Sequence, residues 1–388
     1  MNYGADQTRG VVVSSGARAL PLRAAADAGL LDGIEGLRPD ALRADTLDPI
    51  LTAGRTAWTE LHERLDAVLG QGAQEHLLVD QRDLALRLPF AVADYVDFYS
   101  SIHHATNLGR LLRPGTEPLL PNWRNLPVSY HGRAGTIVVS GTPVRRPCGL
   151  VAGSNGEPEY RPTARLDIEL EVGVVVGGST ALGEPVSIDH VDQHLFGLVL
   201  LNDWSARDIQ AYEYQPLGPH LGKSFATSIS AWVTPLDTLR AFLVAGPPQD
   251  PQPSAHLRTN QAWGLDLDLR VLVESRSMRD RSIPPMQISA TNFAGQYWTV
   301  AQQLAHLTAN GASLRAGDLY GSGTVSGPDR GSEGSFIELS WGGERPLELP
   351  DGTTRTFLED GDCVILEGSA GGDIMLGPVV GEILPARS

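Results

Sequence analysis

The sequence contains very little cysteine. Cys148 and Cys363 are the only two in 388 residues, and they belong to no short motif. Their number excludes a disulfide-built scaffold and a zinc site made of several cysteines. The chain also opens with no basic and then apolar signal sequence, and no apolar run reaches the ~18 residues that a membrane-spanning helix needs. We therefore predict a cytoplasmic protein with no membrane partner.

Positive charge is scarce as well. Lys and Arg number 30 against 46 Asp and Glu, which gives a formal net charge of -16. Such a surface repels a polyanion unless a concentrated basic patch offsets it. The densest basic groups, Arg110 with Arg113 and Arg145 with Arg146, form no long run. We expect no nucleic-acid partner, and we interpret most of the exposed acids as solubilising charge.

The common catalytic signatures are missing too. The sequence has no GxSxG elbow, HExxH helix, CxxC pair or Walker loop. The glycine-rich segment GSGTVSG at 321–327 has the wrong spacing for a GxGxxG nucleotide-binding loop, and we predict a turn there.

Glycine and proline, in contrast, are plentiful, with 43 and 27 residues, which favours a β-rich fold with many turns over a helical bundle. The length suits a small domain followed by a large one. The character of the sequence changes after Leu88–Phe90, so we place the boundary there, with domains at 1–90 and 91–388. In the first, residues 8–22 resemble a hairpin, and apolar residues at helical spacing predict a helix over 55–70.

The second region is predicted to consist mostly of strands and loops. One helix is expected from about Asn292 to Gly311. Alternating or continuous apolar residues predict strands at 135–141, 166–177, 196–203, 267–275, 335–341 and 362–368.

The segment LDIELEVG at 166–173 is the most informative. Because side chains alternate along a strand, Asp167, Glu169 and Glu171 share one face, opposite the apolar residues. Like charges side by side on a sheet are unfavourable. The segment alone fits either a solvated acidic face or a cation held by Glu169 and Glu171.

Further acids and polar residues stand where sites are often built. Asp203 ends an apolar strand, and Asp94 and Asp97 precede His103 and His104. Carboxylates without cysteine suit Mg²⁺ or Ca²⁺ better than zinc, although spacing alone does not show that these segments meet. The remaining candidates are Lys223, Arg207, Gln210 and Glu338.

Several long segments resemble the fumarylacetoacetase family, in the family's order, from about Asp94 to the C-terminus. They are DYVDFYSSIHHATN, LLPNWRNLPVSYHGRAGTIVVSGTPVRRP, LDIELEVG, NDWSARDIQAYEYQPLGPHLGKSFATSISAWV, GDLYGSGTVSG and ELSW. The resemblance implies a mostly β protein with some α structure, in which a small SH3-like N-terminal barrel precedes a large mixed β-roll. It also implies a homodimer and the hydrolysis of 4-fumarylacetoacetate to fumarate and acetoacetate, a step of aromatic amino-acid breakdown.

The resemblance also implies a role for each matching residue. It makes His104 the general base that activates water and Glu338 the carboxylate that orients it, with Arg207, Gln210 and Lys223 around the developing oxyanion. The implied ligands of a divalent cation (Mg²⁺, Ca²⁺ or both) are Asp97, Glu169, Glu171 and Asp203, with Lys223 and Thr227 beside them. The implied contacts to a small β-diketo acid are Tyr99, Arg113, Tyr130, Gln210, Tyr214 and Thr324.

Two departures and two alternatives remain. The stretch before RGVVV lacks most of the family's opening segment, so we expect a trimmed small domain, and Ala226 stands where the family often has glycine. Another enzyme of the superfamily, such as an acylpyruvate hydrolase or a keto-acid decarboxylase or isomerase, would keep the acidic cluster. A non-enzymatic Ca²⁺-binding protein would leave His104 and Glu338 without a role.

Overall fold

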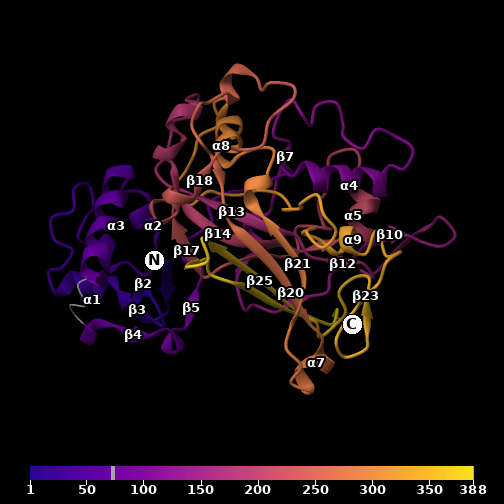
Figure 1. The fold of residues 1–388 in the computed structure, drawn as a ribbon, viewed down its shortest axis with the longest axis horizontal. Coiled ribbons are helices and arrows are strands. Elements are labelled where there is room, and N and C mark those ends of the chain that lie inside the picture. The colour runs from indigo at the N-terminus through magenta and orange to yellow at the C-terminus, as the bar shows by residue number, and fades with distance from the viewer. Residues whose placement is uncertain (71–74, 388) are drawn as a thin grey trace.

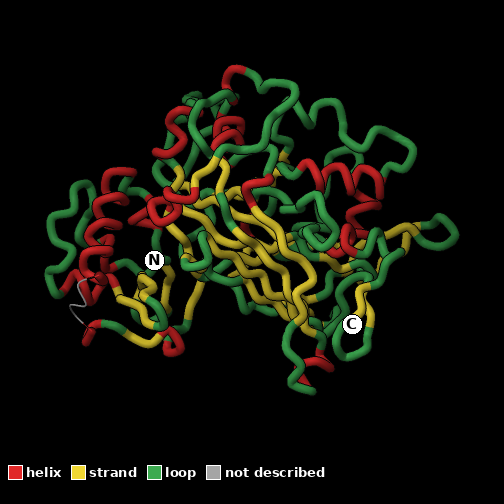
Figure 2. Tube along the Cα trace, in the orientation of Figure 1, coloured by secondary structure: helices red, strands yellow, loops and turns green. Residues whose placement is uncertain are grey.

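A computed structural model gives the structure of the chain and describes residues 1–70 and 75–387. Two sheets form its centre, with the N-terminal ninety residues at one side (Figure 1). Helices and long loops surround the strands (Figure 2). Among the residues with described structure, none of the helices combines the length and the apolar character that crossing a bilayer requires.

The described strands gather mainly into a sheet of 13 strands and a sheet of six. The large sheet contains β1 (Tyr3–Asp6), β2 (Gly10–Ser15), β3 (Arg18–Pro21), β4 (Val79–Asp80), β5 (Leu86–Arg87), β6 (Tyr95–Phe98), β7 (Ser129–His131), β8 (Ile137–Val139), β13 (Leu170–Val176), β14 (Leu195–Asp203), β16 (Thr227–Ile229), β17 (Trp232–Pro235) and β22 (Leu319–Gly321). The six-stranded sheet contains β9 (Val144–Arg145), β20 (Asp268–Glu274), β21 (Met286–Asn292), β25 (Cys363–Ala370), β26 (Ile374–Met375) and β27 (Val379–Leu384).

Four two-stranded ribbons and several short helices complete the described structure. The ribbons are β10 (Cys148–Ala152) with β11 (Pro158–Pro162), β12 (Leu166–Asp167) with β15 (Ser205–Ala206), β18 (Leu243–Val244) with β19 (Gly264–Leu265), and β23 (Leu347–Glu348) with β24 (Thr354–Arg355). The helices are α1 (Leu22–Asp27), α2 (Asp48–Leu51), α3 (Arg55–Gly70), α4 (Ile102–Leu112), α5 (Arg207–Glu213), α6 (Leu236–Leu239), α7 (Arg276–Asp280), α8 (Val300–Thr308) and α9 (Phe336–Leu339).

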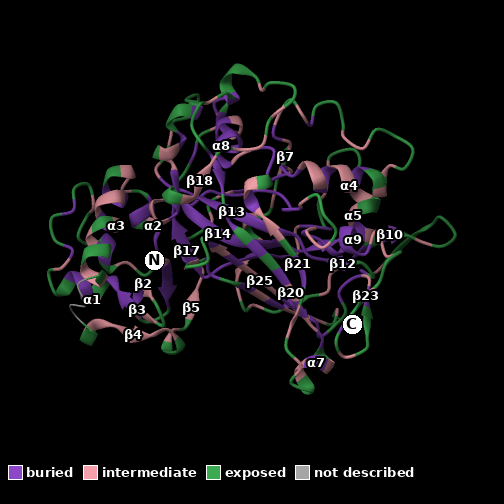
Figure 3. Cartoon of the chain, viewed as in Figure 1, coloured by how far each residue is buried: buried purple, intermediate pink, exposed green. Residues whose placement is uncertain are grey.

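The central strands β13 and β14 are buried on both faces (Figure 3). Their side chains alternate between two cores, as the two-residue period of a strand requires. Leu198 and Leu200 join the core that includes the six-stranded sheet, whereas Val199 and Leu201 join a core shared with the N-terminal region. By the same alternation, Asp203 at the end of β14 lies on the face of Val199 and Leu201.

Several elements lie where the sequence predicts them. The hairpin is β2 paired with β3, and the first long helix is α3 over 55–70. The predicted mostly β fold is confirmed. Strand β1 pairs with β17, with Tyr3 opposite Val233, so the N-terminal strands extend the large sheet. The division at residue 90 and the SH3-like form of the first part stay predictions.

Several predicted elements differ from the structure in type, length or continuity. The strand predicted over 166–177 is divided into β12 and β13, which belong to different sheets, with Ile168 and Glu169 between them. The predicted strand at 335–341 is instead the short helix α9, because four alternating residues fit one helical turn as well as a strand. The helix expected over 292–311 covers only Val300–Thr308, and Asn292 ends β21. Thr299 begins that helix with a capping box to Gln302, which holds its start eight residues later than predicted.

Candidate active site

Four buried carboxylates meet at one end of the large sheet. Asp97 comes from β6, Glu169 from the link between β12 and β13, Glu171 from β13, and Asp203 from the end of β14. One oxygen of each lies within 4.8 Å of the others, and none of the four is more than 5% exposed. The predicted ligand set is thus brought together, and the interpretation of residues 167–171 as a solvated acidic face is wrong.

A glycine makes room for this cluster. Strand β22 runs between β13 and β6, and Gly321 pairs with Gly173 on one side and Asp97 on the other. A Cβ atom at Gly321 would lie 2.6 Å from Glu171 Oε2 and 3.3 Å from Asp97 Oδ1. The side chains of Glu171 on β13 and Asp97 on β6 can therefore approach each other, because Gly321 between them has no side chain. The loop after β22 adds a contact, since the Gly323 N–H donates to Glu171 Oε2 at 3.1 Å.

Two of the four carboxylates have cationic partners. Lys223 Nζ donates to Glu169 and, at 2.6 Å, to Asp203 Oδ2, and Arg207 Nη1 lies 2.7 Å from Glu169 Oε1. Burial alone would raise the pKa of Glu169, but the charges of Lys223 and Arg207 hold that pKa well below its ordinary value. Thr227 Oγ1 donates to Asp203 Oδ1 at 2.9 Å.

The other two carboxylates have no ion-pair partner among the described residues. Burial, together with repulsion from neighbouring carboxylates, raises the pKa of both Asp97 and Glu171 well above the ordinary value. Asp97 Oδ1 and Glu171 Oε1 are buried and accept no hydrogen bond within the described part of the chain. Uncompensated carboxylate oxygens around one point are what a hard divalent cation binds, so the residues present fit such an ion.

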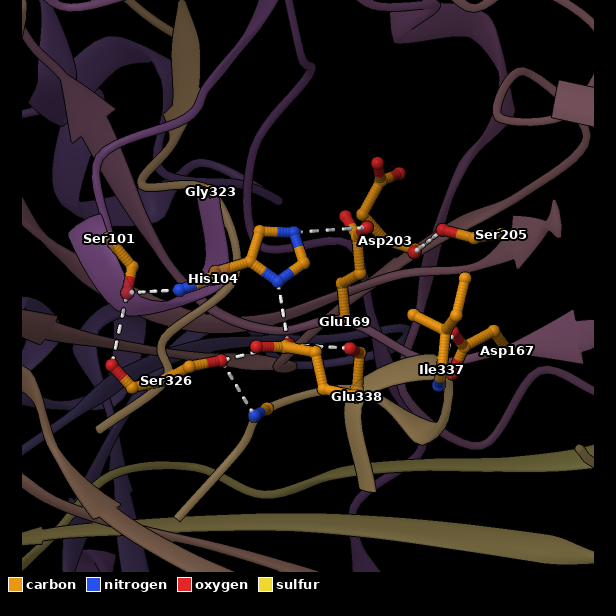
Figure 4. Close-up of polar contacts among 12 residues, drawn as sticks. Ser101, His104, Asp167, Glu169, Asp203, Ser205, Gly323, Ser326, Ile337 and Glu338 are labelled. Atoms are coloured by element: carbon orange, nitrogen blue, oxygen red, sulfur yellow. Dashed lines mark hydrogen bonds and ion pairs between the residues drawn. The ribbon is translucent and has the colours of Figure 1, made fainter. Parts of the chain in front are cut away.

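A histidine–glutamate pair stands beside the cluster (Figure 4). His104 lies in the first turn of α4, where the Ser101 cap accepts its backbone N–H. Its Nδ1 is 2.6 Å from Glu338 Oε2, and its Nε2 is 4.0 Å from Glu169 Oε1. Burial would raise the pKa of Glu338, but the His104 ring lowers it below the ordinary value. An ionised Glu338 accepts from Nδ1–H, which leaves the Nε2 lone pair facing the carboxylates.

Glu338 is held by three residues that the sequence did not single out. Ser326 Oγ and Ser335 Oγ donate to Glu338 Oε2 at 2.9 and 2.7 Å, and Asn107 Nδ2 donates to Oε1 at 3.0 Å. Only the folded chain brings these two hydroxyl groups and one amide group to the carboxylate, although Asn107 closes the segment HHATN and Ser326 lies in GSGTVSG.

The residues predicted around an oxyanion also gather here. Arg207 begins α5 and is 5% exposed, and Gln210 Oε1 accepts from its Nη1 at 3.1 Å. Arg207 Nη2 is buried and has no hydrogen-bond partner within residues 1–70 and 75–387. The guanidinium therefore keeps one donor direction unused, beside Lys223 and the acidic cluster.

The predicted substrate contacts are only partly collected in one cavity. A cavity of about 220 Å³ reaches Asp203, Lys223 and Thr227 and is lined by Tyr130, whose hydroxyl donates to Asp203 at 3.1 Å. The Tyr99 ring meets the His104 ring edge to face, with centroids 5.3 Å apart.

Three other predicted contacts, Thr324, Arg113 and Tyr214, do not line that cavity. Thr324 is buried on the loop after β22, and its hydroxyl has no partner in the described structure. Arg113 caps the end of α4 and donates to the Pro118 carbonyl, and Tyr214 caps α5.

Three other residues that the sequence analysis considered lie outside the site. Asp94 is half exposed and 3.7 Å from Arg315, and His103 borders a different surface hollow. Ala226 packs in the main hydrophobic core and is absent from the cavity lining, so its methyl group fills core space instead of narrowing the cavity.

Solved structures share this fold at low sequence identity. The fumarylacetoacetate hydrolase from Exiguobacterium antarcticum superposes with a TM-score of 0.56 at 14% identity, over all of both chains. The maleylpyruvate hydrolase from Sphingobium sp. SYK-6 gives a TM-score of 0.54 at 12% identity, again over all of both chains. At such identities the likeness establishes the fold alone.

The fold and the site define a hydrolase in which a histidine–carboxylate pair faces an acidic cluster that could hold a divalent cation. The family model described as "Fumarylacetoacetate (FAA) hydrolase C-terminal" matches residues 95–381. Fumarylacetoacetases from Rattus norvegicus and Caenorhabditis elegans are both 45% identical to the chain, over 88% and 98% of it and 84% and 93% of their own lengths. The chain belongs to the fumarylacetoacetate hydrolase family and is an enzyme that hydrolyses carbon–carbon bonds.

Proposed function

We propose that the chain hydrolyses 4-fumarylacetoacetate to fumarate and acetoacetate, the last step of tyrosine and phenylalanine breakdown. Its curated relatives from animals and plants, which it matches over most of their lengths, bear the name fumarylacetoacetase. One observation carries the proposal: the His104 ring stands between Glu338 on its Nδ1 side and the carboxylate cluster on its Nε2 side. A base in that place can deprotonate a water at the edge of the cluster.

The proposed reaction begins when His104 Nε2 takes a proton from water, and the resulting hydroxide adds to the carbonyl carbon beside the bond that breaks. Glu338 stabilises the imidazolium through Nδ1–H. The carbonyl oxygen becomes an oxyanion, which Lys223 and the unused Nη2 of Arg207 stabilise, with Gln210 beside them. The carbon–carbon bond then breaks, the acyl part leaves as fumarate, and the acetoacetate carbanion takes a proton back from His104.

A carbanion is a poor leaving group unless its charge is delocalised. Asp97, Glu169, Glu171 and Asp203 would hold a divalent cation, for which we propose Mg²⁺ or Ca²⁺ because the donor atoms are all carboxylate oxygens. When bound, the cation supplies Lewis acidity toward the diketone oxygens. Lys223 and Thr227 contact two of its proposed ligands, Glu169 and Asp203, and so orient them.

The proposed substrate contacts surround this centre. Arg113 suits a substrate carboxylate, because a guanidinium can bind both oxygens. Tyr99, Tyr130, Tyr214 and Thr324 offer hydroxyl groups, and that of Thr324 is buried without a partner in the described structure.

Substrate selectivity tests the function. The purified enzyme is given 4-fumarylacetoacetate or an acylpyruvate in parallel, and fumarate, acetoacetate and pyruvate are measured. We expect kcat/KM for fumarylacetoacetate to be the larger by at least an order of magnitude. A larger value for the acylpyruvate would assign the chain to a related keto-acid hydrolase, and turnover of neither substrate would leave a structural Ca²⁺ site as the better account.

We further propose that the enzyme is a cytoplasmic homodimer with no nucleic-acid partner, and that residues 1–90 form a separate small domain. The net charge of -16 supports the absence of a nucleic-acid partner. Sedimentation equilibrium would test the dimer, and limited proteolysis near residue 90 would test the division.

A further inference from the structure

Asp167 is a buried acid for which the reaction above has no role. It lies in the ribbon β12–β15 and is 0% exposed. Its Oδ1 accepts the backbone N–H groups of Ile168 and Phe336, both at 2.7 Å. Its Oδ2 accepts Arg207 Nε at 2.7 Å and the Ile337 N–H at 3.1 Å. One carboxylate therefore joins three separate segments of the chain.

All four contacts of Asp167 are donors, so the group acts as an ionised carboxylate. A protonated acid would direct its own O–H toward an N–H donor at one of these positions. Burial raises the pKa of Asp167, and the positive charge of Arg207 opposes that rise. Removing the Arg207 contact would leave the charge uncompensated, so the pair is held together strongly.

Besides its own segment, Asp167 joins α5 and the helix α9, and both of these carry proposed catalytic groups. Arg207 donates from Nε to Asp167, and its Nη1 pairs with Glu169. Its Nη2 therefore stays available for the substrate oxygen. Ile337 directly precedes Glu338, and Figure 4 shows Asp167 beside Ile337 and Glu338. The helix that carries Glu338 has only four residues, and its own N-cap residue, Ser335, makes no capping hydrogen bond. Asp167 supplies the acceptor for that turn instead.

We propose that Asp167 is a positioning residue that fixes the Arg207 guanidinium and the Glu338 helix relative to each other. The proposal rests on the function proposed above. Catalytic groups contribute fully only when they are held in place, and a shift of about 1 Å can cost about 10²-fold in rate. Because both segments contact the same carboxylate, Arg207 keeps a fixed position relative to the pair of His104 and Glu338.

The test replaces one carboxylate oxygen with a donor, by Asp167→Asn. An asparagine accepts at one oxygen only, so its NH₂ group must face either Arg207 and Ile337 or Ile168 and Phe336. We expect kcat to fall about 10²-fold with KM within about threefold, because the misplaced groups act in the transition state. An unchanged kcat would overturn the proposal.

Asp362→Asn is the matched control. Asp362 is 1% exposed, binds Arg355 through both oxygens at 2.8 and 2.9 Å, and accepts a backbone N–H from Glu359. It thus has the same chemistry in another part of the fold. We expect both variants to lose thermal stability and only Asp167→Asn to lose kcat. An equal loss of kcat in the two would reduce Asp167 to a structural residue.

A double-mutant cycle with Arg207→Lys asks whether Asp167 acts through Arg207. We expect the double variant to lose less kcat than the product of the two single losses, because both changes disturb one arrangement. A fully multiplicative loss would overturn the link. If Asp167→Asn folds poorly, Asp167→Glu keeps the charge but shifts it by one methylene group, and Asp362→Glu is its control, with the same outcomes expected.

A crystal structure of the folded variant separates this proposal from the function. We expect a His104 Nδ1–Glu338 Oε2 distance longer than the present 2.6 Å and a displaced Arg207. Unchanged positions of both would overturn the proposal whatever the substrate. Failure of the unmodified enzyme to cleave fumarylacetoacetate would contradict the function, while this geometric comparison would still decide the role of Asp167.

Discussion

The site has two sides, the histidine–glutamate pair and the carboxylate cluster. They differ in how many of their polar atoms have hydrogen-bond or ion-pair partners within the protein. On one side, Glu338 accepts four hydrogen bonds, from His104, Ser326, Ser335 and Asn107. On the other, Asp97 and Glu171 each keep a buried oxygen with no partner in the described structure. The pKa of Glu338 lies below its ordinary value, because the contacts from His104, Ser335 and Asn107 outweigh burial. The pKa of Glu171 lies well above it, because burial and the neighbouring Asp97 both raise it.

This difference indicates a division of labour. The histidine–glutamate side is complete in the folded chain, so its geometry is fixed before any ligand arrives. On the other side, the buried carboxylates repel one another, and a bound cation would reduce that repulsion. Variants of the first side should therefore change the rate, whereas variants of the second should change cation binding.

The largest expected effect belongs to the complete side. His104→Ala removes the proposed base, and we expect kcat to fall about 10²- to 10⁴-fold, measured as loss of fumarylacetoacetate. Cation affinity, measured by calorimetric titration with Mg²⁺ or Ca²⁺, should stay within a few-fold of the unmodified protein. Near-normal turnover in this variant would contradict the role of His104.

The next effect concerns the space inside the cluster. Gly321→Ala would place a Cβ atom 2.6 Å from Glu171 Oε2, so the carboxylates must separate. We expect cation affinity to fall about 10- to 100-fold, measured by the same titration. Gly135→Ala is the control, since its Cβ would meet nothing within 4 Å. Equal affinities in the two variants would show that the cation does not bind between Asp97 and Glu171.

Thermal unfolding of Glu171→Gln, with and without cation, should show that the carboxylate side is the one that a cation stabilises. It replaces a buried carboxyl group whose ionisation the fold opposes, so the cation-free variant should unfold at or above the temperature of the unmodified protein. Cation at 100 times its Kd should stabilise the unmodified protein by about 2.7 kcal/mol and the variant much less. A variant that loses stability without cation and keeps the full cation effect would refute the account of the incomplete side.

The smallest effect is a pH dependence on the complete side. Because the folded-state pKa of Glu338 is lowered, its ionisation stabilises the fold above the unfolded-state pKa of ~4.3, and this stability is lost as the pH falls through the folded-state value. Glu338→Gln should cost about 1–3 kcal/mol at pH 7 and progressively less in acid, measured by urea unfolding. The exposed Glu184→Gln serves as the control and should show no such trend.

The sequence predicted these two sides unequally. The two-residue period of a strand places Glu169 and Glu171 on one face, but only the family resemblance predicted that Asp97 and Asp203 join them. Gly321 was missed because its importance depends on pairing β22 between two distant strands. Ser326 and Ser335 were missed because isolated serines carry no local pattern. Glu338 was predicted to lie on a strand and lies on the helix α9, since a four-residue helix is too short to show a helical period.

The most direct test of the central claim is turnover of 4-fumarylacetoacetate by the purified enzyme, first stripped of divalent cations and then resupplied with Mg²⁺ or Ca²⁺. We expect no release of fumarate and acetoacetate from the stripped enzyme, and full release on resupply. Full turnover without any divalent cation would contradict the claim that a cation completes the carboxylate side of the site.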